Sequence, residues 1–235
     1  MTMPQLLASQ GVALACLLTT VVTYFVSKRL YKRYRHWWLS PMIVTPACLV
    51  SVVLLFAIPL PTYFAYSHYL SALLAPATIA FALPIYRERH LILRYPMTIS
   101  IGVLTGLFAG LISSWLLVKV IYLPPELSHS MLVRSVSTPF AIEATSAFGG
   151  VPDLTAMLVL VTGILGMLLC APIFKLARIR SPLAKGAALG ASAHGVGAAK
   201  AAELGQEEGV VASLTMILTG IAMVIGAPFF AYLLV

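Results

Sequence analysis

The chain holds 235 residues, of which 60% are hydrophobic and only 9% are charged, with a formal net charge of +8. Soluble domains carry about a quarter charged residues, so this composition excludes an ordinary soluble domain and predicts an integral membrane protein. Nucleic-acid binding does not follow from the positive charge, because most basic residues cluster in three short segments that flank apolar stretches (28–35, 87–94 and 175–185). Lys and Arg in such loops mark the cytoplasmic side of a membrane protein.

Five stretches contain no Asp, Glu, Lys or Arg: 6–27, 39–86, 95–118, 154–174 and 210–235. A helix that crosses the hydrocarbon needs roughly 20 mainly apolar residues, so 39–86 predicts two crossings and each other stretch predicts one. A β-barrel would show short alternating segments instead. The predicted fold is therefore an all-α integral membrane protein with about six full transmembrane helices.

We expect one membrane domain over residues 1–235, made of a first helix with its basic loop, an N-terminal half and a C-terminal half (1–38, 39–129 and 130–235). The first apolar stretch has no basic residues before it, so we interpret it as a retained helix and not as a signal peptide. The basic loops then predict an outside N-terminus. Cys16, Cys48 and Cys170 lie in apolar spans without metal-ligand spacing, which favours small buried hydrophobic residues.

Two segments do not fit a simple alternation of crossings. Residues 130–152 must begin and end outside, because the next helix has to reach the basic segment 175–185 on the inside. Residues 186–209 must likewise begin and end inside. Both are too long for plain loops, which predicts two re-entrant or broken-helix segments that enter from opposite faces. Irregular backbone at membrane depth needs protein or a water-filled cavity to satisfy it, so a binding site is the economical explanation.

A short internal echo is compatible with a transporter. Residues 73–84 and 135–146 share a small-residue, proline and alanine pattern, and each is followed by a helix that contains Thr-Gly. Paired, proline-interrupted segments in two halves of a chain indicate a transporter site. The match is short, and a true structural repeat and a chance likeness remain open. The glycines at 102, 106 and 110 favour a helix contact.

The first special segment, TPFAIEATSAFGG and the residues before it, carries candidate anion-binding groups. Pro139 disfavours helix at Thr138, and a helix that restarts there presents free N–H groups and a positive dipole end. Ser137, Thr138 and Thr145 add hydroxyl donors, and Arg134 adds a cation. The alternatives are that the hydroxyls only cap broken backbone and that Arg134 reaches the membrane surface.

Two titratable residues are candidates for proton coupling. Glu143 is nine residues from the nearest preceding charge, and an isolated carboxylate in a membrane usually faces a cavity or a partner. His194 lies between small residues in SAHGVGAAK and titrates near neutral pH if unperturbed, although a hydrogen-bonded structural histidine is an equal alternative. From the same segment, Ser192, Gly195 and Lys200 complete the expected substrate-binding set, and interfacial pairing is the alternative for Lys200.

Three sequence blocks closely resemble the LrgB/CidB family: SVSTPFAIEATSAFGGVPDLTA, ARIRSPLAKGAALGASAHGVGAAKAAELGQEEG and SLTMILTGIAMVIGAPFF. A weaker match, LLAPATIAFALPIYRERHLI, extends the resemblance over roughly residues 40–235. The resemblance implies one of two functions. Bacterial members are described as holin- or antiholin-like modulators of murein hydrolase activity, whereas plant relatives are plastidial glycolate/glycerate translocators and other bacterial relatives are linked to pyruvate transport.

Two opposed polar segments suit a carrier better than a lesion-forming protein, so we expect transport of small hydroxy- or keto-monocarboxylates, with lysis control as the alternative. An enzyme is disfavoured, because the sequence has no nucleophile–base, metal or phosphate-loop motif, and we expect no cofactor and no metal. The resemblance further implies a separate small LrgA/CidA-like membrane partner and the bacterial cytoplasmic (inner) membrane. We expect a homo-oligomer, a dimer, with a small organic anion as ligand.

Overall fold

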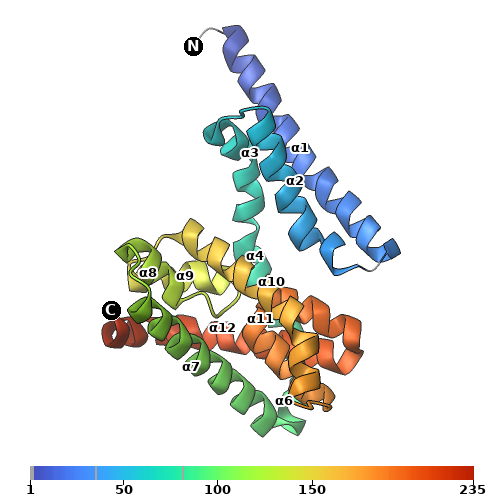
Figure 1. Ribbon diagram of the computed structural model, residues 1–235, viewed down its shortest axis with the longest axis vertical. Helices are drawn as coiled ribbons and strands as arrows, with labels where there is room; N and C mark the ends of the chain where they lie inside the picture. The colour runs from blue at the N-terminus through green and yellow to red at the C-terminus, as the bar shows by residue number, and fades with distance from the viewer. Residues whose placement is uncertain (1–2, 35, 81) are drawn as a thin grey trace. The chain divides into compact units, whose positions relative to one another are not determined.

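The computed structural model describes residues 3–34, 36–80 and 82–235 (Figure 1). Within these residues every regular element is a helix, which confirms the all-α prediction. The chain divides into two compact units, Met1–Pro76 and Ala77–Val235. This boundary falls inside the expected N-terminal half, and the expected division at 129/130 falls inside the second unit.

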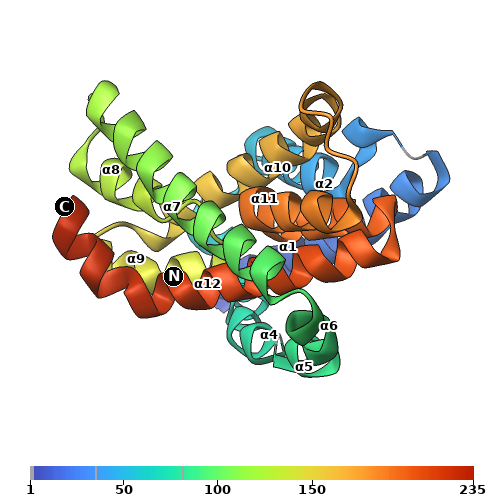
Figure 2. The same cartoon turned by 90° about the horizontal axis from the view of Figure 1, so that it is seen from below.

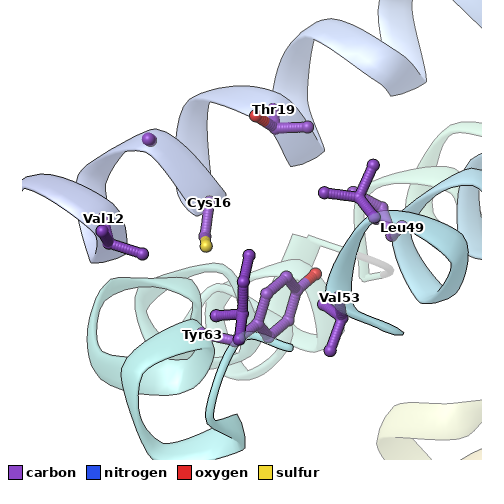
Figure 3. A pocket seen from close by; sticks show the side chains of 9 residues that line it. Val12, Cys16, Thr19, Leu49, Val53 and Tyr63 are labelled. Atoms are coloured by element: carbon purple, nitrogen blue, oxygen red, sulfur yellow. The ribbon is translucent and has the colours of Figure 1, made fainter. Parts of the chain in front are cut away.

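The first unit consists of three main helices and a short 3-10 helix: α1 (Met3–Tyr34), η1 (Trp37–Leu39), α2 (Pro41–Leu55) and α3 (Leu60–Ala72). Both α2 and α3 pack on α1. A hydroxyl contact of 3.1 Å between Thr20 and Tyr63 joins α1 to α3. A cavity of about 180 Å³ lies between α1, α2 and the start of α3, and Figure 3 shows its mainly apolar lining. This unit carries no candidate site residue.

The second unit begins in α4 (Leu74–Ala80), which spans the boundary, and continues through α5 (Ala82–Arg87), α6 (Arg89–Arg94), α7 (Pro96–Val120), α8 (Pro125–Leu132), α9 (Thr138–Phe148), α10 (Pro152–Leu176), α11 (Pro182–Leu204) and α12 (Gln206–Leu234). Helix α12 lies along α11 and packs on α7 and α9 (Figure 2). Its buried face, from Val211 to Ala231, contributes much of the core.

Helices α7 and α10 separate two kinds of surface along their length. On α7, Ile101, Leu104, Phe108 and Ile112 are exposed, whereas Ile99, Val103, Leu107 and Leu111 are buried. The exposed side of α10 is also apolar, with Met157, Val161, Leu165 and Leu169. An apolar outer face is what contact with lipid requires, because a water-facing helix would be polar there. The chain is therefore a membrane protein.

Four helices of the described chain are long and apolar enough to cross a membrane: Gln10–Tyr34 within α1, then α7, α10 and α12. A 25-residue helix such as α7 or α10 spans about 38 Å, more than the hydrocarbon thickness of about 30 Å. The two further crossings expected in 39–86 correspond to shorter helices, of 15 residues in α2 and 13 in α3. The count of six stays a prediction.

Candidate functional site

The two ends of the first special segment, residues 130 and 150–151, lie side by side in the second unit. Ser130 near the end of α8 accepts a hydrogen bond from the backbone N–H of Val151, at 2.8 Å. A Cβ added to Gly150 would lie 2.8 Å from the backbone nitrogen of Ser130. The two ends of 130–151 are thus in contact, so the segment forms a closed hairpin of α8, a five-residue link (133–137) and α9.

Local sequence explains both ends of α9. Ser137 is extended (φ −68°, ψ 150°), and Pro139 occupies the first turn, where its missing N–H has no helical partner to lose. At the other end Gly149 takes a left-handed conformation (φ 70°). The Gly150 N–H donates to the Thr145 carbonyl at 3.2 Å and the Gly149 N–H donates to the Ser146 carbonyl, the pattern of a Schellman motif.

Helix α11 reverses direction at His194. This residue has φ 50° and ψ −128°, outside helical geometry, and non-glycine residues rarely adopt a positive φ. In a straight helix Leu189 and Gly197 would be about 12 Å apart, yet a Cβ on Gly197 would lie 2.9 Å from the carbonyl carbon of Leu189. The two halves of α11 therefore fold back on each other, with His194 at the tip.

Both halves of this second hairpin pack on α12. A Cβ added to Gly190 would lie 2.8 Å from the Ala212 Cα, and one added to Gly209 would lie 2.9 Å from the Ala202 Cα. A Cβ added to Gly186 would lie 3.2 Å from the Glu208 Cα, so the first half runs in the direction of α12 and the second half, folded back at His194, runs against it. Small residues allow this approach because larger side chains would hold the backbones apart.

The tips of the two hairpins meet. The imidazole of His194 lies beside the backbone of Ser135, and the positive charge of Arg134 acts on it electrostatically. A Cβ on Gly110 of α7 would contact Ser135, and one on Gly166 of α10 would lie 2.7 Å from the Ala193 Cβ. Since Gly110 and Gly166 are in the middle portions of their helices, the tips lie between the centres of α7 and α10.

Polar groups concentrate where the tips meet. Arg134 donates from Nη1 to the Thr162 hydroxyl at 3.2 Å. Its Nε and the hydroxyls of Ser135 and Ser137 are buried without a hydrogen-bond partner in the described chain. The ring of His194 is buried beside the Ser135 backbone and makes no hydrogen bond of good geometry within the described chain. Ser135, Ser137 and His194 are no more than 5% exposed. Leaving a buried polar group unpaired costs about 1–3 kcal/mol, so this cluster is suited to bind a polar ligand.

The donors in this cluster favour an anion. A guanidinium offers charge-assisted hydrogen bonds in a planar array that matches a carboxylate. Two serine hydroxyls can donate or accept, and the imidazole of His194 can donate from either nitrogen, depending on its tautomer. Within the described residues no group of three His, Cys, Asp or Glu side chains could hold a metal ion.

The structure brings three of the sequence-predicted site residues into this cluster, namely Arg134, Ser137 and His194. Thr138 and Pro139 are half-buried in the first turn of α9. Thr145 has structural partners instead: its hydroxyl contacts the Ala141 carbonyl at 2.6 Å and the Thr155 hydroxyl at 2.9 Å. It joins α9 to α10.

The other predicted residues lie outside the buried cluster. Glu143 is on the exposed face of α9, and Ser192 and Gly195 are exposed beside the tip of α11. Lys200 forms an ion pair with Glu203, with 2.9 Å between Nζ and Oε2. The sequence-based alternative for Lys200 was interfacial pairing, and the observed pair lies within one turn of the helix.

Sequence reasoning missed Ser135 and Thr162. Ser135 begins the hydroxyl-rich segment 135–146, and Thr162 belongs to the Thr-Gly pair of the helix that follows. Neither pattern shows which residues meet. The available signal was the glycine spacing on α7 and α10, since Gly110 and Gly166 contact the tips. The glycines at 102, 106 and 110 indicated a helix contact without indicating the partner.

Comparison with known proteins identifies relatives over nearly the whole chain. The model of the LrgB-like family matches residues 20–233. The uncharacterized protein YwbG of Bacillus subtilis is 36% identical over 218 residues, which cover 93% of this chain and 97% of that protein. The holin-like protein CidB of Staphylococcus aureus is 30% identical over 209 residues, covering 89% and 91%. No solved structure matches. The chain belongs to the LrgB-like family.

Proposed function

We propose that this protein is a secondary carrier of small hydroxy- or keto-monocarboxylates, such as glycolate, glycerate or pyruvate. The observation that supports the proposal is a group of buried polar atoms at the meeting tips that make no hydrogen bond of good geometry within the described chain: Nε of Arg134, the hydroxyls of Ser135 and Ser137, and the ring nitrogens of His194. One guanidinium matches one carboxylate in charge, and neighbouring hydroxyl and imidazole groups can bind the hydroxyl or keto oxygen of the same acid.

In this proposal the two hairpins enter the membrane from opposite faces. Support comes from α10, because the first hairpin closes at Val151 directly before this helix, whereas the second begins at Pro182 beyond its other end. The 11 residues of α9 span about 17 Å, roughly half the hydrocarbon thickness. The basic loops support an outside N-terminus with six crossings.

Sided cysteine labelling tests this topology. In a variant without Cys16, Cys48 and Cys170, single cysteines at the exposed positions 153 and 184, next to the ends of the two hairpins, should react with impermeant reagents from opposite sides of the membrane. Labelling of both positions from the same side would contradict the opposed hairpins, whatever the substrate proves to be.

The second candidate function is holin-like control of murein hydrolase activity. The similarity to CidB, which is named a holin-like protein, favours this function. A lesion formed by assembly needs no buried, convergent donor group, and this is why we place the carrier first. Lysis effects would then follow from metabolite flux. The proposal includes a small LrgA/CidA-like membrane partner, a homodimeric state and the bacterial cytoplasmic membrane.

Proton coupling is the last element of the proposal. His194 is the better placed of the two titratable candidates, because its ring lies at the hairpin tips beside Arg134, whereas Glu143 is on the exposed face of α9. A histidine at the site can change charge in each transport cycle, which a guanidinium cannot. We propose that the anion is taken up together with a proton, and that His194 binds and releases this proton in each cycle.

Uptake of labelled pyruvate, glycolate and glycerate into proteoliposomes tests the transport function, with and without the small partner. Arg134→Gln should lower the initial rate at subsaturating substrate by at least ~10-fold, because a hydrogen bond to a charged group is lost. Lys119→Gln removes one positive charge from an exposed site on α7 and serves as the matched control. Absence of saturable uptake of all three acids in every condition would overturn the carrier function and leave the holin-like one.

A further inference from the structure

The hydroxyl of Thr162 on α10 makes two hydrogen bonds, one as a donor and one as an acceptor. Its hydroxyl donates to the carbonyl of Leu158, one turn earlier, at 2.8 Å. The hydroxyl proton is thereby committed, and the oxygen lone pairs are left to accept from Nη1 of Arg134, at 3.2 Å. The contact joins a rigid transmembrane helix to the tip of the first hairpin, 28 residues away in sequence.

Arg134 has a long side chain that a fixed partner can orient. It lies in the link between α8 and α9, outside regular helix. A guanidinium on a free side chain has about 2 kcal/mol of rotamer entropy to lose on binding. Held by Thr162, the side chain loses this freedom before the ligand arrives, which is how preorganisation improves affinity.

The bonded nitrogen also decides which edge of the guanidinium is presented. Nη1 lies on the same side as Cδ, so its contact with Thr162 leaves the edge made by Nε and Nη2. Nε is buried and has no partner in the described chain. Two parallel N–H groups on one edge form the geometry that binds a carboxylate in bidentate fashion.

The same part of α10 receives the second hairpin. A Cβ on Gly163, the next residue after Thr162, would lie 3.2 Å from the Ala193 carbonyl oxygen and 3.0 Å from a methyl group of Val196. Residues 162–166 of α10 therefore contact both tips. These residues position the Arg134 side chain, through Thr162, and the backbone next to His194, through Gly163 and Gly166.

We propose that Thr162 is a positioning residue that orients Arg134, so that the Nε–Nη2 edge of the guanidinium binds the substrate carboxylate. This inference rests on the proposed transport of monocarboxylates. It assigns the anion specificity of the site to a helix residue that need not touch the substrate. Arg134→Lys cannot replace the guanidinium, because an ammonium has no paired planar donors.

The test compares Thr162→Val, which keeps the shape and removes the hydroxyl, with Thr162→Ser, which keeps the hydroxyl. For pyruvate uptake into proteoliposomes, Thr162→Val should raise the half-saturation concentration by about 10-fold, as expected for a lost hydrogen bond to a charged group. The maximal rate should stay near that of the parent, and Thr162→Ser should restore the parent value. Equal half-saturation concentrations for Thr162→Val and the parent would overturn the proposal, as would equal losses in both variants.

A second readout separates this inference from the transport function. Phenylglyoxal modifies guanidinium groups, and peptide mass mapping reports its rate at Arg134, with the exposed Arg178 as an internal reference. Thr162→Val should speed modification of Arg134 relative to Arg178, whereas Thr162→Ser should not. An unchanged ratio in Thr162→Val would overturn the positioning role even if uptake were confirmed. A raised ratio without any uptake would leave positioning intact and contradict the carrier function.

Discussion

The two hairpins of the second unit supply the candidate site in different ways. The first has a five-residue link as its tip, and this link carries Arg134, Ser135 and Ser137. The second has a single non-helical residue, His194, between two halves rich in Gly and Ala. An extended link can present several polar side chains, whereas a one-residue reversal presents one and depends on close backbone packing. Substitutions in the link of the first hairpin should therefore impair ligand binding, whereas substitutions in the second hairpin should mainly impair packing.

The largest expected effect is on packing of the second hairpin. In Gly190→Ala the new methyl group would contact the Ala212 carbonyl of α12, and backbone cannot move aside as a flexible side chain would. Overpacking of this kind costs about 1–3 kcal/mol or more, so the melting temperature in detergent should fall strongly. Gly195→Ala is the matched control for stability, since its Cβ would meet no atom within 4 Å. Equal melting temperatures for the two variants would contradict the packing described.

His194 should show opposite effects on stability and function. A non-glycine residue at positive φ costs about 1–3 kcal/mol, and glycine adopts this region readily. His194→Gly should therefore be at least as stable as the parent to thermal unfolding, yet lose uptake because the imidazole is gone. His194→Ala should lose uptake without the gain in stability. Full uptake by His194→Gly would show that the tip serves only as a turn.

A hydroxyl pair should hold the first hairpin with a smaller contribution. Thr145 and Thr155 are fully buried, and their hydroxyls are 2.9 Å apart. Thr145→Val and Thr155→Val should each lower the free energy of unfolding by about 1 kcal/mol. The double variant should lose less than the sum of the two, because each single variant already removes the hydrogen bond that the two residues share. Strict additivity would mean that the two residues act independently.

The smallest expected effect concerns Glu143. Its side chain is exposed on α9, so Glu143→Gln should keep the dependence of uptake on an imposed pH gradient. His194→Asn should remove that dependence from whatever uptake remains. If both variants kept the dependence of the parent, neither residue would carry the proton. A parent protein that ignored the gradient would be a facilitated carrier.

Much of the fold could be predicted because it depends on local chemistry and on the positions of the basic loops. These loops mark the cytoplasmic side and so show which segments do not cross the membrane. Pro139 indicated the start of α9, and the same-side ends of 130–152 and of 186–209 predicted two special segments. The structure has chain reversals in both predicted segments, although their depth in a membrane stays a prediction.

The composition of the buried cluster was harder to predict because it depends on register between distant elements. Glu143 follows Thr138 by five residues, about 140° around a helix, so the two cannot share one face of α9. A short helix shows too little periodicity to decide which of the two faces is buried. Likewise Arg134 and Thr162 are 28 residues apart, and no local pattern joins them.

Cross-linking of the two tips tests the central claim most directly. In the cysteine-free background, cysteines at positions 135 and 194 should be joined within one chain by a short bifunctional methanethiosulfonate, as detected by peptide mass mapping. Position 119, at the end of α7, paired with position 194 is the control that should not be joined. Added pyruvate should slow the 135–194 reaction, because the anion would occupy the space between the tips. Failure of a folded protein to form the 135–194 cross-link, or equal reaction of the control pair, would contradict a site made where the two hairpins meet.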